Sequence, residues 1–235
     1  MNVDEPIGRR TVIAAGAGAV LSLVPVGSVP RIQEKIDPEQ GVTAPEDLMK
    51  EHGVLNRCLL IYEEAMRRLH AKHDVPPEVF NHTALLVKRF VEEYHEKNEE
   101  KYIFPVFKKA KKHVDLVRTL ETQHKAGRVV TARIIDLSNP TKYRSKENQA
   151  RIVSSCQAFI RMYRPHEARE DTVLFPALRE ILTAKQVEAL GGRMEEDEQK
   201  VLGKEGFEKS RDQVAAIEKQ LGIYDLNQFT PSVAR

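Results

Sequence analysis

Six histidine and glutamate residues, two types that commonly ligate metal ions, recur along this chain at helical spacing. Two His-x-x-x-Glu motifs place a histidine and a glutamate four residues apart, so each pair lies on one helix face about one turn apart. One further histidine precedes the first motif by 43 residues, and another precedes the second by 42. The full set is His52, His95, Glu99, His124, His166 and Glu170.

The two motifs belong to an internal repeat. Residues 95–105 and 166–176 align with an offset of 71, and His, Glu, Glu, Phe and Pro coincide at five of the eleven positions. The chain therefore contains a helical hairpin twice, with one histidine on the first helix and His-x-x-x-Glu on the second. When the two hairpins face each other, they gather four histidines and two glutamates.

This grouping predicts a pair of metal ions. Glu99 and Glu170 fall on apolar helix stripes, where a carboxylate without a counter-charge is costly to bury. Mixed imidazole and carboxylate ligands suit iron, with manganese or zinc as alternatives. One histidine on an apolar face is usually an ordinary core residue, but a matched set of six favours ligation. The other histidines lie near helix ends or turns, and no role is assigned to them: His70, His73, His82 and His113.

Four amphipathic segments with short connections predict an all-α, up-down-up-down four-helix bundle. Their apolar stripes cover about residues 48–69, 87–102, 116–135 and 152–177, and the second is expected to end near Pro105. Additional C-terminal helices should pack outside the bundle. The first begins at a capping box formed by Thr183 and Gln186, and the last runs from about residue 205 to 222.

The composition suits one soluble domain with a sizeable core: 41% of the 235 residues are hydrophobic and 31% charged. With 37 basic and 35 acidic residues interspersed, no basic stripe indicates nucleic-acid binding. Cys58 and Cys156 form neither a disulfide framework nor a CxxC site, and we predict free thiols.

The N-terminus differs from the rest of the chain. Arg9 and Arg10 precede an uncharged apolar stretch over residues 11–26, which resembles a twin-arginine export signal. The alternatives are an uncleaved membrane anchor or a mobile apolar tail. We expect an exported protein, periplasmic or extracytoplasmic, and otherwise a cytoplasmic one, with membrane contact only through residues 9–28. The expected organisation is a signal-like or anchor segment (1–28), a linker (29–44), the bundle (45–182) and a C-terminal helical extension (183–235).

The pattern as a whole resembles the hemerythrin-like, His-His-Glu cation-binding family in its bacterial form. The resemblance covers about residues 45–182 and rests on Glu51-His52, the two repeat segments and His124. It implies a four-helix bundle that holds a non-haem di-iron centre and binds oxygen or related small ligands.

Two departures from the oxygen carriers of that family affect the expected chemistry. Those carriers have a further histidine one turn from His124, where this chain has Leu120 and Arg128, so the site is one histidine short. Asp171 stands where the carriers have an aspartate, whereas Glu170 matches the His-His-Glu branch and the repeat. We prefer Glu170, with Asp171 as the alternative.

A few neighbours of the six residues are further candidates. Glu96 and Glu167 could join the coordination shell, and Glu198 is a remote candidate. Tyr163, one turn before His166, is a core residue, a hydrogen-bond donor to the site or a ligand. Gly127, one turn after His124, leaves space beside the site.

A site with fewer ligands has more positions open to a small ligand, as in catalytic metal sites. The sequence therefore predicts a protein with two iron ions that binds or reduces oxygen, peroxide or nitric oxide, in sensing or detoxification. The alternatives are an iron-binding or storage module without turnover and a helical interaction domain with a vacant site. No protein partner is indicated, and whether the protein is an enzyme is left open.

Overall fold

The computed structural model describes residues 43–233, and every regular element in that range is a helix. The signal-like segment and nearly all of the predicted linker lie outside the described residues, so export stays a prediction. Among the described helices, none combines the length and the apolar character needed to span a membrane.

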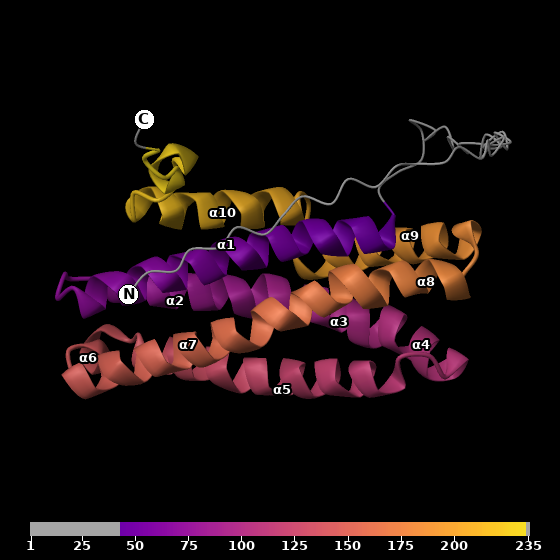
Figure 1. The fold of residues 1–235 in the computed structure, drawn as a ribbon, viewed down its shortest axis with the longest axis horizontal. Helices are drawn as coiled ribbons and strands as arrows, with labels where there is room; N and C mark the ends of the chain where they lie inside the picture. The colour runs from indigo at the N-terminus through magenta and orange to yellow at the C-terminus, as the bar shows by residue number, and fades with distance from the viewer. Residues whose placement is uncertain (1–42, 234–235) are drawn as a thin grey trace, which may run out of the picture. The chain divides into compact units, whose positions relative to one another are not determined.

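Four long rods lie side by side along a common axis (Figure 1). The first is α1 (Ala44–His70) and the third is α5 (Val114–Leu137). The second rod is continuous through α2 (Pro77–Leu86), η1 (Val87–His95), α3 (Glu96–Asn98), η2 (Glu99–Ile103) and α4 (Phe104–Ala110). The fourth rod joins α7 (Lys146–Arg169), η3 (Glu170–Leu174) and α8 (Phe175–Ile181), after the short α6 (Pro140–Tyr143).

Consecutive rods run in opposite directions, because short turns connect them at alternate ends (Figure 1). The rod α1 packs against the second rod and α7, and α5 packs against the same two rods. Each rod therefore has two neighbouring rods, and one face of each looks toward a shared interior.

The second helix does not end near Pro105, as the sequence suggested, but continues to Ala110. Proline lacks an N–H, and its ring clashes with the carbonyl four residues earlier in an α-helix. The turn before Pro105 is a π-helix, η2, and the turn before Pro176 is another, η3. These wider turns carry the chain past each proline without ending the rod. Each begins at a glutamate of the repeat, Glu99 or Glu170, and π-helical turns of this kind are frequent at functional sites.

The apolar core is divided into two clusters. One includes Leu55, Tyr62 and Phe159, and the other includes Leu48 and Phe175. A layer of buried histidines and glutamates from all four rods lies between them in sequence and in space. Hydrophobic burial on both sides therefore supports a polar layer in the middle of the bundle.

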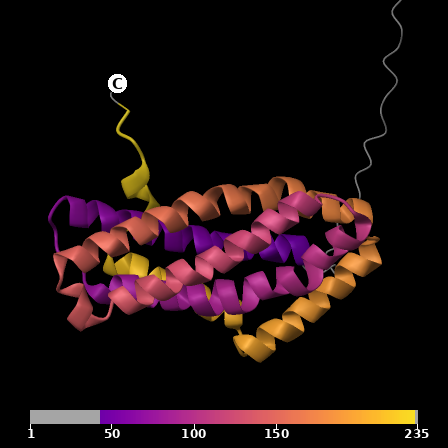
Figure 2. The ribbon, with the colours of Figure 1, turned by 90° about the horizontal axis from the view of Figure 1, so that it is seen from below.

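The C-terminal extension consists of α9 (Ala184–Val201), α10 (Gly206–Gln220) and the short η4 (Leu226–Phe229). The predicted capping box is confirmed: the backbone N–H of Thr183 donates to Oε1 of Gln186 at 2.9 Å. Helix α10 packs on α1 and α2, and α9 crosses α1 and η1 obliquely (Figure 2). Both helices therefore cover the outside of the bundle, as expected from the sequence.

The rods α5 and α7 approach closely at Gly127. A Cβ atom at this position would lie only 2.1 Å from the hydroxyl oxygen of Tyr163. The space expected beside Gly127 is thus filled by the Tyr163 side chain. The missing side chain of the glycine is what allows this tyrosine to lie flat between the helices.

We expect Gly127→Ala to destabilise the protein by about 1–3 kcal/mol, because the added methyl group overpacks the core against Tyr163. The matched control is Gly192→Ala in α9, where a Cβ would meet no atom within 4 Å. That control should gain about 1 kcal/mol from helix propensity. Denaturant unfolding measures both, and equal effects of the two substitutions would contradict this packing.

Candidate metal centre

The structure brings all six predicted residues together in the polar layer, and none of them is more than 4% exposed. The first and third rods each supply one histidine, and the second and fourth rods each supply a histidine and a glutamate. Their elements are α1 (His52), η1 (His95), η2 (Glu99), α5 (His124), α7 (His166) and η3 (Glu170).

The four histidines form two pairs. The Nε2 atoms of His52 and His95 are 3.1 Å apart, and those of His124 and His166 are 3.3 Å apart. Two nitrogens at that separation fit one ion at about 2.0–2.1 Å from each. We call the place between His52 and His95 position A and the place between His124 and His166 position B.

The two glutamates lie between these positions. The Oε2 atom of Glu99 is 3.7 Å from Nε2 of His95 and 3.4 Å from Nε2 of His124. The Oε2 atom of Glu170 is 3.4 Å from Nε2 of His52 and 3.2 Å from Nε2 of His166. Each carboxylate thus approaches one histidine of each position, which is the arrangement of a bridging ligand.

The donor set fits metal ions on a direct observation. All four carboxylate oxygens of Glu99 and Glu170 are buried, and none of them has a hydrogen-bond partner among the described residues. Buried polar atoms are normally hydrogen-bonded, so a group of four such oxygens needs an explanation. Two cations beside the histidine nitrogens would supply the missing partners. Among the inner residues, two groups of donors lie close enough to hold an ion. The group at position A is His52, His95 and Glu99, and the group at position B is Glu99, His124, His166 and Glu170.

Each histidine has an outer oxygen partner that favours the tautomer required for metal binding. Their Nδ1 atoms face outward to acceptor oxygens, and the distances are 2.8 Å (His52 to Asp171), 2.7 Å (His95 to Glu51), 3.2 Å (His124 to Glu100) and 2.8 Å (His166 to Gln123). An Nδ1–H that donates to such an oxygen leaves the lone pair on Nε2, which points inward. These acceptors also fix the orientation of each ring.

The surroundings of the two positions follow the internal repeat. The residue before the first histidine of each hairpin, Glu51 or Gln123, accepts from the second histidine of the same hairpin. Two aromatic contacts between the hairpins are also equivalent under the repeat. Phe104 stacks on His124 and Phe175 stacks on His52, at centroid distances of 5.4 and 5.8 Å. The repeat in sequence is thus a two-fold arrangement in space.

The charges in the layer interact strongly. Burial opposes protonation of His52, but its hydrogen bond to Asp171 and the nearby charge of Glu170 raise its pKa well above the ordinary value. Burial likewise disfavours charged His124, but Glu100 and Glu99 raise its pKa to about 10. Burial lowers the pKa of His95 to about 4 and raises the pKa of Glu51 to about 8. A cation that binds here must displace protons from His52 and His124, so metal affinity rises with pH.

The neighbouring candidates from the sequence lie in an outer ring. Tyr163 donates its hydroxyl proton to Oε1 of Glu96 at 2.5 Å, so it is a donor to that ring rather than an inner ligand in this structure. Glu96 forms an ion pair with Arg128, and Asn56 donates to Glu167.

Glu198 is also outside the six-residue cage. It accepts the backbone N–H of Phe207 at 2.7 Å, at the start of α10. Asp171, the alternative to Glu170, accepts from His52, and its side chain is 35% exposed. Leu120 is buried in the apolar cluster next to the layer. The remaining histidines are exposed, and Cys58 and Cys156 are buried free thiols.

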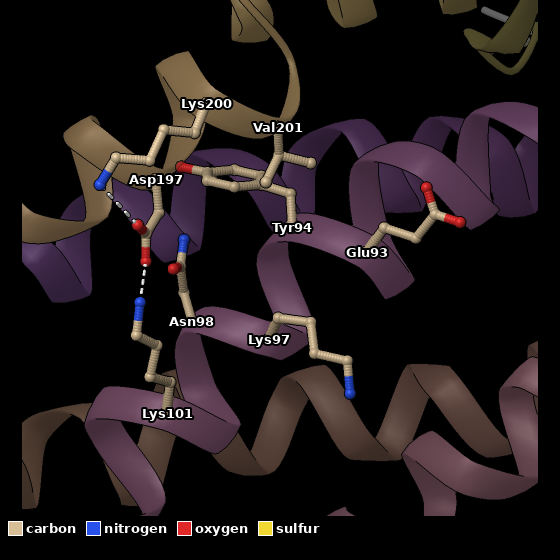
Figure 3. Close-up of a pocket in the computed structure, with 8 residues that line it drawn as sticks. All are labelled: Glu93, Tyr94, Lys97, Asn98, Lys101, Asp197, Lys200 and Val201. Carbon is tan, nitrogen blue, oxygen red and sulfur yellow. Dashed lines mark hydrogen bonds and ion pairs between the residues drawn. The ribbon is translucent and has the colours of Figure 1, made fainter.

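A pocket of about 250 Å³ lies on the outer side of position A, where α9 meets the second rod (Figure 3). The ring of Tyr94 lines this pocket, and its hydroxyl donates to Oε1 of Glu51 at 2.7 Å. Asp197 of α9 pairs with Lys101 and Lys200 at the pocket edge. The C-terminal extension therefore contributes to the shell around position A through Tyr94 and Glu51.

Sequence analysis did not assign roles to Glu100, Gln123, Arg128 or Asn56, although the repeat contained a usable signal. The alignment of residues 95–105 with 166–176 already pairs Glu100 with Asp171, and aligning the first histidines of the two hairpins pairs Glu51 with Gln123. Residues next to a ligand on a helix point away from it, so their contact with the opposite histidine depends on how the rods pack.

Comparison with known proteins agrees with this geometry. The model of the hemerythrin HHE cation-binding domain matches residues 43–178. The chain belongs to this family. It is also 44% identical over 234 residues to uncharacterized proteins of Mycobacterium bovis and Mycobacterium tuberculosis, covering 96% of this chain and 92% of theirs. No solved structure matches the chain. Membership of the family implies cation binding, with iron as the usual ion, and the cage of this chain supplies residues suited to it.

Substitution of the two adjacent acidic residues separates their roles. We expect Glu170→Gln to lose at least one of two bound ions, because it removes a charged ligand shared by both positions. Asp171→Asn should keep both ions with affinity about 10–100-fold lower, the usual effect of a residue that orients a histidine ligand. Metal content and chelator competition measure the difference. If Asp171→Asn lost an ion while Glu170→Gln kept both, Asp171 would be the ligand.

Proposed function

We propose that this chain is a non-haem di-iron protein that binds or reduces a small oxidant, namely oxygen, peroxide or nitric oxide, in sensing or detoxification. The observation that carries the proposal is the arrangement of the inner layer. Two buried carboxylates without hydrogen-bond partners in the described part of the chain lie between the histidine pair of position A and that of position B. An up-down-up-down four-helix bundle is the arrangement that presents one ligand set from each hairpin to this layer.

The cage would leave room for a ligand on its ions. Each position receives two histidine nitrogens and at most one oxygen from each of two carboxylates. Iron commonly takes up to about six ligands, so at least two positions per ion stay open for water or an oxidant. Leu120 and Arg128 stand one turn on either side of His124, where the oxygen carriers of the family have a further histidine, and neither adds an inner ligand. Open positions of this kind support reaction as well as binding.

The protein's own residues prepare the site. Phe104 and Phe175 stack on His124 and His52 and form an apolar wall that limits the entry of water. The four Nδ1 acceptors hold the imidazoles in place with their Nε2 atoms toward the cage. Bound iron would supply Lewis acidity and electrons for the oxidant.

The geometry favours this function over the alternatives. A storage module needs room for many ions, whereas the inner donors converge on two positions. A third acidic group beside His124, formed by Glu96 and Glu100, already holds the Arg128 guanidinium at 2.7 and 2.6 Å. An interaction domain with a vacant site would give no reason to bury Glu99 and Glu170 without partners.

Anaerobic loading with ferrous iron, followed by mixing with hydrogen peroxide, tests the proposal. We expect peroxide consumption with oxygen evolution, and Glu99→Gln should reduce it at least about tenfold because a ligand of both positions is lost. His82→Ala, at an exposed position on α2, is the control and should leave the reaction unchanged. Bound iron without any reaction toward peroxide, oxygen or nitric oxide would favour a binding or storage role instead.

A further inference from the structure

The inner ligands of positions A and B are of the same two kinds, but mutually close donors number four at position B and three at position A, where Glu170 lies outside the set. Each has two histidines whose Nε2 atoms are about equally far apart, and the same two carboxylates lie between the positions. Glu99 and Glu170 lie slightly nearer to the histidines of position B, by 0.3 Å (3.7 against 3.4 Å) and 0.2 Å (3.4 against 3.2 Å). Shifts of this size are within the reach of ordinary side-chain movement. These inner differences favour position B, so a tighter position A must come from the residues behind the ligands.

Those residues differ in charge. At position A both histidines donate to carboxylates, because Glu51 accepts from His95 and Asp171 accepts from His52. At position B only His124 donates to a carboxylate, Glu100, and at a longer distance of 3.2 Å. His166 donates instead to the neutral side-chain amide oxygen of Gln123.

A second difference in charge also favours position A. Arg128, one turn after His124, places its guanidinium 2.6 Å from Oε1 of Glu100, the oxygen that also faces His124. At the matching place in the other hairpin, one turn after His52, the chain has the neutral Asn56, which donates to Glu167. The carboxylate behind position B is therefore neutralised by a cation. Among the described residues, the only basic group within ion-pair distance of Asp171 is His52 itself.

Charge behind a histidine changes its strength as a ligand. A carboxylate that accepts from Nδ1–H increases the electron density on Nε2 and stabilises the positive charge of the bound ion. A neutral amide, or a carboxylate paired with a guanidinium, does this less. Two such carboxylates act at position A once Glu51 is ionised, a state that a bound cation favours, whereas position B has one, and that one is shared with Arg128.

We propose that the two metal positions are unequal, such that position A holds its ion tightly and position B holds an ion that exchanges. This inference rests on the proposed metal pair. It assigns Glu51 and Gln123, which occupy matching places in the repeat, as the positioning residues that set the difference. Position B is then the half of the centre that fills last and empties first.

Zinc titration of the full metal-free chain against a chromophoric chelator tests this, because zinc suits the same ligands and does not change oxidation state. We expect two binding steps that differ at least about tenfold in dissociation constant. Glu51→Gln should weaken the tighter step about 10–100-fold, and Gln123→Glu should strengthen the weaker step by a similar factor. The double exchange, Glu51→Gln with Gln123→Glu, should bring the two steps together or reverse their order.

The outcomes separate this inference from the proposed function. Two equal steps, or a Gln123→Glu variant whose weaker step is unchanged, would overturn the inequality while leaving the metal pair intact. Fewer than two bound ions in the unsubstituted chain would overturn both. Damage to the fold cannot imitate the expected result, since Gln123→Glu is predicted to increase affinity. Thermal unfolding of the metal-free variants provides a check that Glu51→Gln still folds.

Discussion

The structure depends on the burial of two carboxylates, Glu99 and Glu170, in the centre of a helical bundle. Their four oxygens have no hydrogen-bond partner among the described residues, and an unpaired buried charge of this kind is expensive. Four histidine nitrogens surround these oxygens at 3.2–3.7 Å. Cations placed among them turn a costly arrangement into a stabilising one, because the attraction between metal and ligand offsets the cost of removing both from water.

Other features of the chain serve this layer. Two apolar clusters flank it and provide the hydrophobic burial that offsets the cost of ordering polar side chains. The π-helical turns at Glu99 and Glu170 carry each rod past a proline. The outward Nδ1 acceptors fix the histidines, and Tyr94 connects Glu51 to the helices added at the C-terminus. The centre is therefore supported by the entire described chain rather than by its six inner residues alone.

The sequence predicted the helices and the inner residues because both depend on local periodicity. Residues four apart share a helix face in any packing, and the repeat doubled that signal. The continuation of the second rod past Pro105 was less accessible, since a π-helical turn is a response to tertiary constraints that local propensity does not encode. The difference between Glu170 and Asp171 depends on which side of the fourth rod faces inward, and only the packed bundle shows this.

The outer ring was predictable only in part. Tyr163 was considered as a donor, but its acceptor, Glu96, is 67 residues away in the chain. In the sequence, Arg128 was noted only because a histidine was missing there. Its ion pair with Glu100 places a positive charge beside position B, and this charge distinguishes the two halves of the centre. Such contacts join residues of different hairpins, so a single sequence without the fold gives no distance between them.

The most direct measurement of the central claim is the anomalous scattering of crystals of the anaerobically iron-loaded protein at the iron absorption edge. The account predicts two peaks inside the bundle, one between His52 and His95 and one between His124 and His166, with Glu99 and Glu170 between them. A single peak, peaks outside this layer, or no iron in the cage would contradict it.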